Sequence, residues 1–172
     1  MTLEQQAQIS QNITIGLFGT CGKSKWREPF IKKYNELGIN YFNPQVDNWD
    51  GTFAKQEAEH LSKDQIILLP VTDETYGSGS LTEIGFSILQ TIQPDDLRYF
   101  IVLTDDDISD RLTDKVARDE SLRSRKLVKE HLSKLHLNNI YIVQSLDEML
   151  KISLEVYDIL KRQINLKANK TA

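Results

Sequence analysis

The stretch Gln65-Ile-Ile-Leu-Leu-Pro-Val-Thr-Asp-Glu-Thr-Tyr-Gly-Ser-Gly-Ser-Leu-Thr-Glu83-Ile-Gly85 decides the fold class of this chain. Its apolar segment, 66–69, does not alternate with polar residues, which is typical of a parallel strand buried on both faces. A polar loop with glycines follows, and Glu83 then stands at the start of an apolar-periodic helix. Open α/β sheets bind ligands at the carboxyl ends of their strands, so this junction is a candidate site.

Glu83 has two interpretations. As an acid in the first turn of its helix, it would only complement the positive end of the helix dipole. As a residue that faces a ligand pocket, it could act as a nucleophile or a base. The helix terminus beside it carries unpaired backbone N–H groups, which favour anions. The sequence leaves both interpretations open.

Strand-like and helix-like segments alternate along the whole chain. Strands are expected at 13–18, 40–42, 66–69, 99–103 and 140–143, and helices at 26–37, 54–62, from 83, at 114–135 and from 145. The alternation predicts one doubly wound α/β domain, 1–172, with a five-stranded parallel sheet covered by helices on both faces. We expect the flavodoxin-like or Rossmann-like order 2-1-3-4-5, in which the glycine-bearing loops after the first and third strands flank the switch point. The polar tail, 165–172, is expected to be flexible.

Composition narrows the function classes. A chain of 172 residues with 40% hydrophobic and 27% charged residues is typical of a globular domain. Its net charge of −4 offers no general reason to bind nucleic acid. A single cysteine cannot form an intrachain disulfide, and we see neither a membrane-length apolar run nor a secretory signal. We therefore expect a cytoplasmic protein without nucleic-acid or membrane partners.

The first glycine loop nearly matches a P-loop. Gly22-Lys23-Ser24 is present, but the glycine required five positions before Gly22 is replaced by Leu17. A P-loop helix would also begin near these residues, which would place Pro29 inside it. A P-loop phosphohydrolase is thus the less favoured alternative. The loop could still cradle a phosphate through its backbone, with Lys23 or Arg27 pairing to it.

Three short motifs resemble one enzyme family. The segment Gly77-Ser-Gly-Ser-Leu-Thr-Glu83-Ile-Gly-Phe-Ser87 resembles the nucleotide-sugar site of the nucleoside 2-deoxyribosyltransferase superfamily. Phe18-Gly-Thr-Cys-Gly-Lys-Ser24 is similar to the strand-one turn of its nucleotide N-glycosidase branch, and Asn43-Pro44 with Trp49 resembles a divergent branch. The resemblance spans 13–103 and implies cleavage of an N-glycosidic bond or pentosyl transfer.

The resemblance also implies residue roles. Glu83 would be the nucleophile that forms a glycosyl-enzyme intermediate, and Glu57, with Glu59 as the neighbouring candidate, would assist the leaving base. No cofactor or metal is implied, and relatives that share active-site parts suggest a homo-oligomer. For Trp26 packing in the core competes with stacking on a base. The candidate substrate-binding residues are Gly19, Thr20, Gly22, Lys23, Trp26, Asn43, Trp49, Ser78, Gly79 and Ser80.

The chain also departs from the family pattern. The tyrosine that orients the nucleophile would fall near Gly16 or Phe18, and neither has a hydroxyl group. The acid expected six residues before the nucleophile is Gly77. These departures favour hydrolysis, a different sugar or a loss of activity. The alternative function is a non-catalytic module that binds or senses a nucleotide on the same fold.

For the other polar groups we favour structural roles over functional ones. The acids 105–107 with Asp110 could bind a hard cation, but we favour a role in capping the next helix. The histidines lack the spacing of a zinc site. The basic residues between Arg123 and Lys129 are expected on a solvated helix face, and Cys21 is taken as incidental.

Overall fold

The computed structural model describes residues 13–46, 50–91 and 98–170. Its sheet has five parallel strands in the order β2-β1-β3-β4-β5. This result confirms the predicted fold class and strand order. The strands are β1 (Thr14–Leu17), β2 (Asn40–Phe42), β3 (Ile66–Val71), β4 (Tyr99–Thr104) and β5 (Ile140–Val143).

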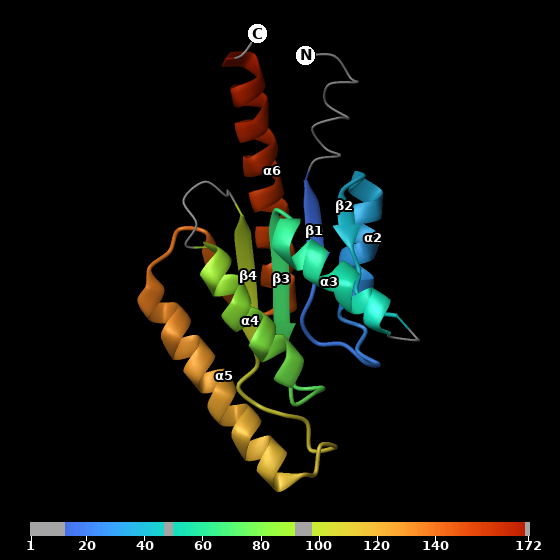
Figure 1. Ribbon diagram of the computed structural model, residues 1–172, viewed down its shortest axis with the longest axis vertical. Helices are drawn as coiled ribbons and strands as arrows, with labels where there is room; N and C mark the ends of the chain where they lie inside the picture. The colour runs from blue at the N-terminus through green and yellow to red at the C-terminus, as the bar shows by residue number, and fades with distance from the viewer. Residues whose placement is uncertain (1–12, 47–49, 92–97, 171–172) are drawn as a thin grey trace.

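Helices cover both faces of this sheet. Those described are α2 (Arg27–Leu37), α3 (Gly51–Lys63), α4 (Ser78–Thr91), α5 (Lys115–Leu135) and α6 (Leu146–Lys170). Figure 1 shows α3, α4 and α5 in front of the sheet and α6 behind it, and α2 packs on the same side as α6. Each described helix is too short or too polar to cross a membrane.

The packing of β3 explains why its sequence does not alternate between apolar and polar residues. Ile66 and Leu68 pack into the core beneath α2 and α6, whereas Ile67 and Leu69 pack into the core beneath α4 and α5. All residues of β3 are buried, so both faces of the strand need apolar side chains.

The strand extends past its predicted end, through Pro70 to Val71. A proline is tolerated there because β1 pairs only with residues 66–68 of β3, so no N–H group is needed from Pro70 on that side. The Pro70 carbonyl instead accepts a hydrogen bond from the backbone N–H of Thr20 at 2.8 Å. The loop after β1 is thereby attached to the end of β3.

Local signals set the helix ends. Gly38 ends α2 in the left-handed conformation, with φ of 63°. The side chains of Asp50 and Asp114 cap the first turns of α3 and α5. Helix α6 continues through residues 165–170, where we expected a polar tail, and its C-terminal half projects beyond the sheet (Figure 1).

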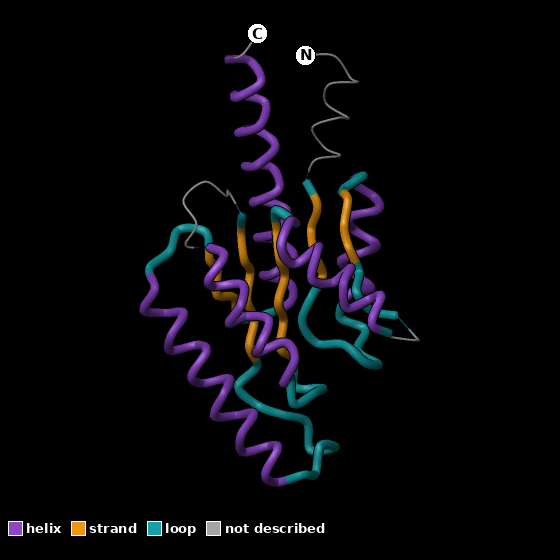
Figure 2. Tube along the Cα trace, viewed as in Figure 1, coloured by secondary structure: helices purple, strands orange, loops and turns teal. Residues whose placement is uncertain are grey.

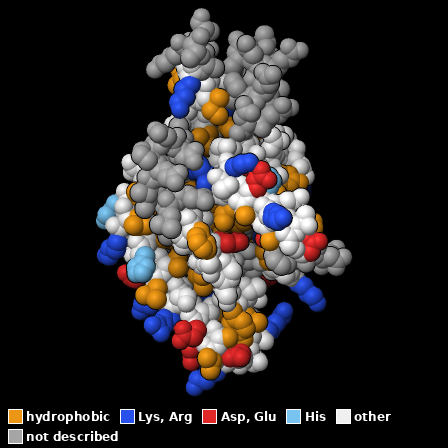
Figure 3. All heavy atoms as spheres, viewed as in Figure 1, with side chains coloured by type: hydrophobic (Ala, Val, Ile, Leu, Met, Phe, Trp, Pro, Cys, Tyr) orange, Lys and Arg blue, Asp and Glu red, His pale blue; other side chains and the backbone are white. Residues whose placement is uncertain are grey.

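The loops gather where the strands end. Figure 2 shows extended loops below the carboxyl ends of β1, β3 and β4. On the face seen in Figure 3, acidic and basic side chains are interspersed, with hydrophobic side chains scattered between them. Because the loops gather at the carboxyl ends of the strands, we expect a ligand site at this edge of the sheet.

Candidate functional site

A cavity of about 560 Å³ opens between the loops after β1, β2 and β3. Residues from α3 and from the first two turns of α4 complete its wall. It lies beside the predicted switch point of the sheet. Its lining consists of Gly19, Cys21, Gly22, Pro44, Gln45, Val46, Glu57, Thr75, Gly77, Ser78, Gly79, Ser80 and Glu83.

Two of the lining glycines permit close backbone contacts. Gly19 has φ of +84°, and a Cβ atom there would lie 2.4 Å from the Pro70 carbonyl oxygen. Gly77 has φ of +70°, and its Cβ would lie 2.4 Å from Val71 Cγ1. Only glycine fits both positions without strain. The loops after β1 and β3 therefore both pack closely against the carboxyl end of β3.

Glu83 lies in the second turn of α4, because the helix begins at Ser78. The interpretation of Glu83 as a first-turn acid is therefore wrong. Burial raises the pKa of its carboxyl group above the ordinary value of 4.5, the neighbouring Glu57 carboxylate acts in the same direction, and the pKa reaches about 7. The Gly19 backbone N–H and the Arg27 guanidinium oppose this rise in pKa. Near neutral pH the group is thus a mixture of carboxylic acid and carboxylate, able to donate or accept a hydrogen bond.

Arg27 lies beneath the cavity and not in it. Its side chain is 2% exposed, and its guanidinium donates to the carbonyls of Leu17 at 2.8 Å and Thr20 at 2.7 Å. Another donor faces the Phe18 carbonyl at 3.2 Å. These bonds hold the loop after β1 from below. The hypothesis that Arg27 pairs with a phosphate is therefore wrong.

Arg125 holds the loop after β3 in the same way. The side chain is 1% exposed, although we expected it on a solvated helix face. It donates to the carbonyls of Val71 at 2.7 Å, Thr72 at 2.8 Å and Thr75 at 2.7 Å. That expectation is wrong because Arg125 shares the buried side of α5 with Ser121, four residues earlier. The helical spacing of this stripe is the signal that could have located it.

The structure brings most candidate residues to one place. Seven of the twelve proposed from the sequence line the cavity: Gly19, Gly22, Glu57, Ser78, Gly79, Ser80 and Glu83. Glu57 and Glu83 reach it from different helices, α3 and α4. Lys23 lines a neighbouring cavity.

The other described candidates do not line the first cavity and instead make contacts within the protein. Thr20 is buried, and its hydroxyl accepts the Thr72 backbone N–H at 2.9 Å. The Trp26 indole N–H donates to the Thr20 carbonyl at 2.8 Å, and its ring packs against Phe30 in the core. Asn43 closes a turn by accepting the Gln45 N–H. Trp49 lies outside the described residues.

Sequence reasoning missed several lining residues. Pro44, Gln45 and Val46 follow β2, whose carboxyl end meets the same edge of the sheet. Gln45 Nε2 donates to the Gly22 carbonyl at 2.6 Å, which joins the first two loops. Cys21, which we took as incidental, also lines the cavity. For Pro44, Gln45 and Val46, the position directly after the second strand was the signal that could have located them.

The structure also corrects two further interpretations of the sequence, the P-loop alternative and the capping role of the acids at 105–107. Helix α2 begins at Arg27, after Gly22-Lys23-Ser24, so the helix start of a P-loop does not form there. Asp105 accepts the Asp73 backbone N–H at 2.9 Å, and α5 is capped by Asp114, so the acidic run at 105–107 does not cap that helix. Among the described residues, no cluster of histidine, cysteine or acidic side chains could hold a metal ion.

Comparison with known proteins identifies a similar fold. Neither a family model nor a curated protein sequence matches this chain. The chain is similar to one in the crystal structure of the RPS4 and RRS1 TIR domain heterodimer, with a TM-score of 0.50 and 13% identity. The match covers 84% of this chain and 97% of that one. The overall fold is therefore TIR-like.

This similarity corrects the family resemblance drawn from the sequence. The assignment to the nucleoside 2-deoxyribosyltransferase superfamily, with its transferase and N-glycosidase activities, is wrong, because the fold matches a TIR domain. The motif around Glu83 is short, and it describes a strand–loop–helix junction that many doubly wound sheets can form. The motif therefore located a cavity without identifying a family.

Proposed function

We propose that this chain is a non-catalytic module that binds a nucleoside or nucleotide in the cavity beside Glu83. The observation that carries the proposal is the cavity itself, formed by three loops at the carboxyl edge of the sheet and by the first turns of α4. Ligand sites of doubly wound sheets form at this edge. A volume of about 560 Å³ falls within the usual range for small-molecule sites.

The polar groups in the lining suit a nucleoside. Sugar hydroxyls and the edges of bases both donate and accept hydrogen bonds. The Glu83 carboxyl group can match either role, because its pKa of about 7 leaves both protonation states populated. The hydroxyls of Ser78 and Ser80 supply further donors and acceptors, and the amide oxygen of Gln45 supplies an acceptor.

The same features argue for binding without turnover. A carboxylate nucleophile must be ionised, and burial beside Glu57 keeps much of Glu83 protonated near neutral pH. The neighbouring positions on and after β1, Gly16 and Phe18, carry no hydroxyl that could orient it. A neutral acid in a polar cavity is better suited to recognising a ligand than to attacking one.

Calorimetric titration with nucleosides and 5′-monophosphates, followed by chromatography for free base, tests the proposal. We expect saturable binding, no base release and an affinity of Glu83→Gln within about threefold of wild type, since glutamine keeps a donor and an acceptor. Glu59→Gln is the matched control, because Glu59 is exposed and pairs with Lys63 outside the cavity.

A second variant blocks the cavity. A Cβ atom at Gly79 meets no atom within 4 Å and Gly79 lines the cavity, so the side chain of Gly79→Phe starts in open space at the cavity wall. We expect this variant to remain folded and to lose binding. Absence of binding in the folded wild type, or release of base by it, would overturn the proposal.

A protein–protein role is a second candidate, because the similar chain belongs to a heterodimer of TIR domains. Phe86 on α4 is 62% exposed and Leu127 on α5 is 47% exposed, so both of these helices present a large apolar side chain to solvent. We propose that the chain pairs with a second copy of itself through these helices. Light scattering across a concentration series should show a dimer that Phe86→Ser weakens. A monomer at all concentrations would contradict the pairing.

A further inference from the structure

A second cavity of about 480 Å³ adjoins the first. Cys21, Gly22 and Thr75 line both cavities, so the two meet along a shared boundary. The second cavity lies between the loops after β1, β3 and β4. A ligand that fills the first cavity and is longer than a nucleoside would therefore reach toward the second.

The two cavities differ in charge. Among the described residues, the lining of the first cavity contains two carboxyl groups, Glu57 and Glu83, and neither lysine nor arginine. The second cavity is lined by Lys23 and Arg111. Neither cation forms an ion pair within the part of the chain that the structure describes. Of the two cavities, the second is therefore the better place for an anionic group of a ligand.

Backbone hydrogen bonds place the loop that carries Arg111. The Ser109 backbone N–H donates to the Asp73 carbonyl at 2.9 Å, and the Asp73 N–H donates to the Asp105 carboxylate at 2.9 Å. Arg118 on α5 also donates to the Ser109 carbonyl at 3.0 Å. The loop after β4 is therefore tied to the loop after β3, and Arg111 on the loop after β4 lines the second cavity.

The acids of the second cavity limit the charge that it accepts. Asp73 and Glu74 line it together with the two cations, so its formal charges balance. The Glu74 carboxylate already accepts hydrogen bonds from the hydroxyls of Ser24 and Thr72. A phosphate can pair with the two cations, whereas each further phosphate would face the carboxylates without an added cation.

We propose that the second cavity binds the phosphate of a nucleoside 5′-monophosphate whose nucleoside occupies the first cavity. Lys23 and Arg111 provide the charge-assisted hydrogen bonds to the phosphate. The site then prefers a monophosphate to the uncharged nucleoside and to the triphosphate. This inference rests on the proposed function and names its ligand class.

Calorimetry tests the preference with adenosine, guanosine, cytidine and uridine, and with their 5′-monophosphates and 5′-triphosphates. For the base that binds, we expect the monophosphate to bind about tenfold more tightly than the nucleoside, because a charged hydrogen bond contributes roughly that factor. Its affinity should fall as salt is raised, since the phosphate contacts are partly exposed.

Variants locate the phosphate. Lys23→Gln and Arg111→Gln should each lose most of the gain from the phosphate and leave nucleoside affinity unchanged. Lys25→Gln is the matched control, because Lys25 is in the same loop, is 80% exposed and pairs with Glu28 outside both cavities. It should behave as wild type.

The outcomes separate the two proposals. A monophosphate that binds no tighter than its nucleoside overturns the inference and leaves the proposed function standing. So does a phosphate gain that survives in both variants, which would place the phosphate at the N-terminus of α4. Failure of every nucleoside and nucleotide to bind the folded protein overturns both.

Discussion

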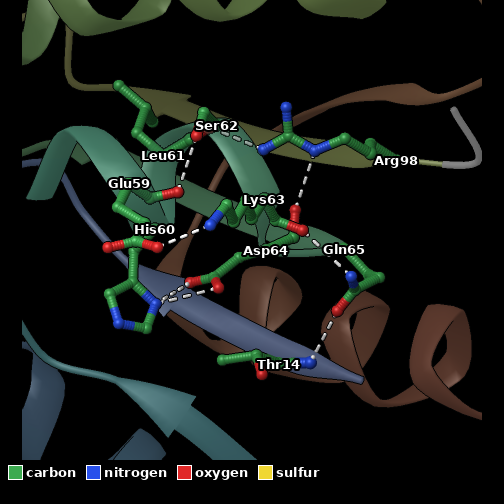
Figure 4. A network of polar contacts seen from close by, with 9 residues as sticks. All are labelled: Thr14, Glu59, His60, Leu61, Ser62, Lys63, Asp64, Gln65 and Arg98. Carbon is green, nitrogen blue, oxygen red and sulfur yellow. Dashed lines mark hydrogen bonds and ion pairs between the residues drawn. The ribbon is translucent and has the colours of Figure 1, made fainter. Parts of the chain in front are cut away.

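Buried charged groups have different neighbours at the two ends of the sheet. At the amino end, Asp64 is 4% exposed, and its carboxylate lies 2.9 Å from His60 Nδ1. Arg98 donates to the carbonyls of Asp64 and Leu61, so charges of both signs meet in one network (Figure 4). At the carboxyl end Arg27 and Arg125 likewise donate mainly to backbone carbonyls, but the partly buried carboxyl group there, Glu83, has a second carboxylate, Glu57, as its neighbour.

This difference indicates which end of the sheet has polar groups available to bind a ligand. Burial raises the pKa of Asp64, but His60 and Arg98 work against that rise. At Glu83 burial and Glu57 act together, and the pKa reaches about 7. The amino end thus satisfies its own charges, whereas the carboxyl end holds its loops firmly and leaves Glu83 at the wall of a cavity.

The largest expected effect comes from removing a buried arginine at the carboxyl end. Arg125→Met leaves several buried carbonyls without a donor and should lower the free energy of unfolding by about 4 kcal/mol, measured by urea denaturation. It should also weaken nucleotide binding under conditions where the variant is folded, because the loop after β3 walls the cavity.

Arg98→Met is the matched variant at the amino end, where the arginine is also buried. We expect it to lower stability while nucleotide affinity stays within about threefold of wild type, since its carbonyl partners lie at the far end of the sheet. Equal losses of affinity in both variants would contradict the distinction between the ends.

The next effect concerns the backbone of the cavity. Gly19→Ala places a Cβ atom 2.4 Å from the Pro70 oxygen at φ of +84°, and should cost about 3 kcal/mol of stability. Gly79→Ala lies in α4 with open space around its Cβ, and should be neutral or stabilising by up to about 1 kcal/mol. Thermal unfolding of both variants checks the contrast. Similar melting temperatures would show that the loop after β1 is not closely packed against β3.

A smaller effect depends on pH. The folded-state pKa of Glu83 is about 7, above its ordinary value of 4.5, so the folded protein loses stability as pH rises between these values. The shift corresponds to roughly 3 kcal/mol, which partial exposure reduces to about 2 kcal/mol. Glu83→Gln should remove that part of the pH dependence, as urea unfolding at pH 5 and pH 8 would show. An unchanged slope would mean that Glu83 is ionised without cost.

The smallest effect belongs to the amino end. The His60 ring stacks on Phe42 at 3.7 Å between centroids, and its Nδ1 contacts Asp64. His60→Ala should cost about 1 kcal/mol of stability. Nucleotide affinity, measured by calorimetry, should not change. A large loss of affinity would show that the two ends are coupled through α3, which also carries Glu57.

Much of the fold could be predicted because its signals are local. The unalternating run in β3 indicated burial on both faces, and the alternation of strand-like and helix-like segments indicated the parallel sheet. The same logic placed Glu83 beside the switch point. It failed for Arg125, which looked like one of several solvated bases in a charged helix.

Local sequence patterns were sufficient to predict the order of elements, the parallel sheet and the edge at which a candidate site lies, because periodicity and turn chemistry act over a few residues. Which charges are buried depends on how the chain is packed. The carbonyls that Arg125 binds lie about fifty residues away in sequence, and the pKa of Glu83 depends on Glu57 from another helix. Desolvation and long-range contacts arise only when the chain is packed, so no local pattern encodes them.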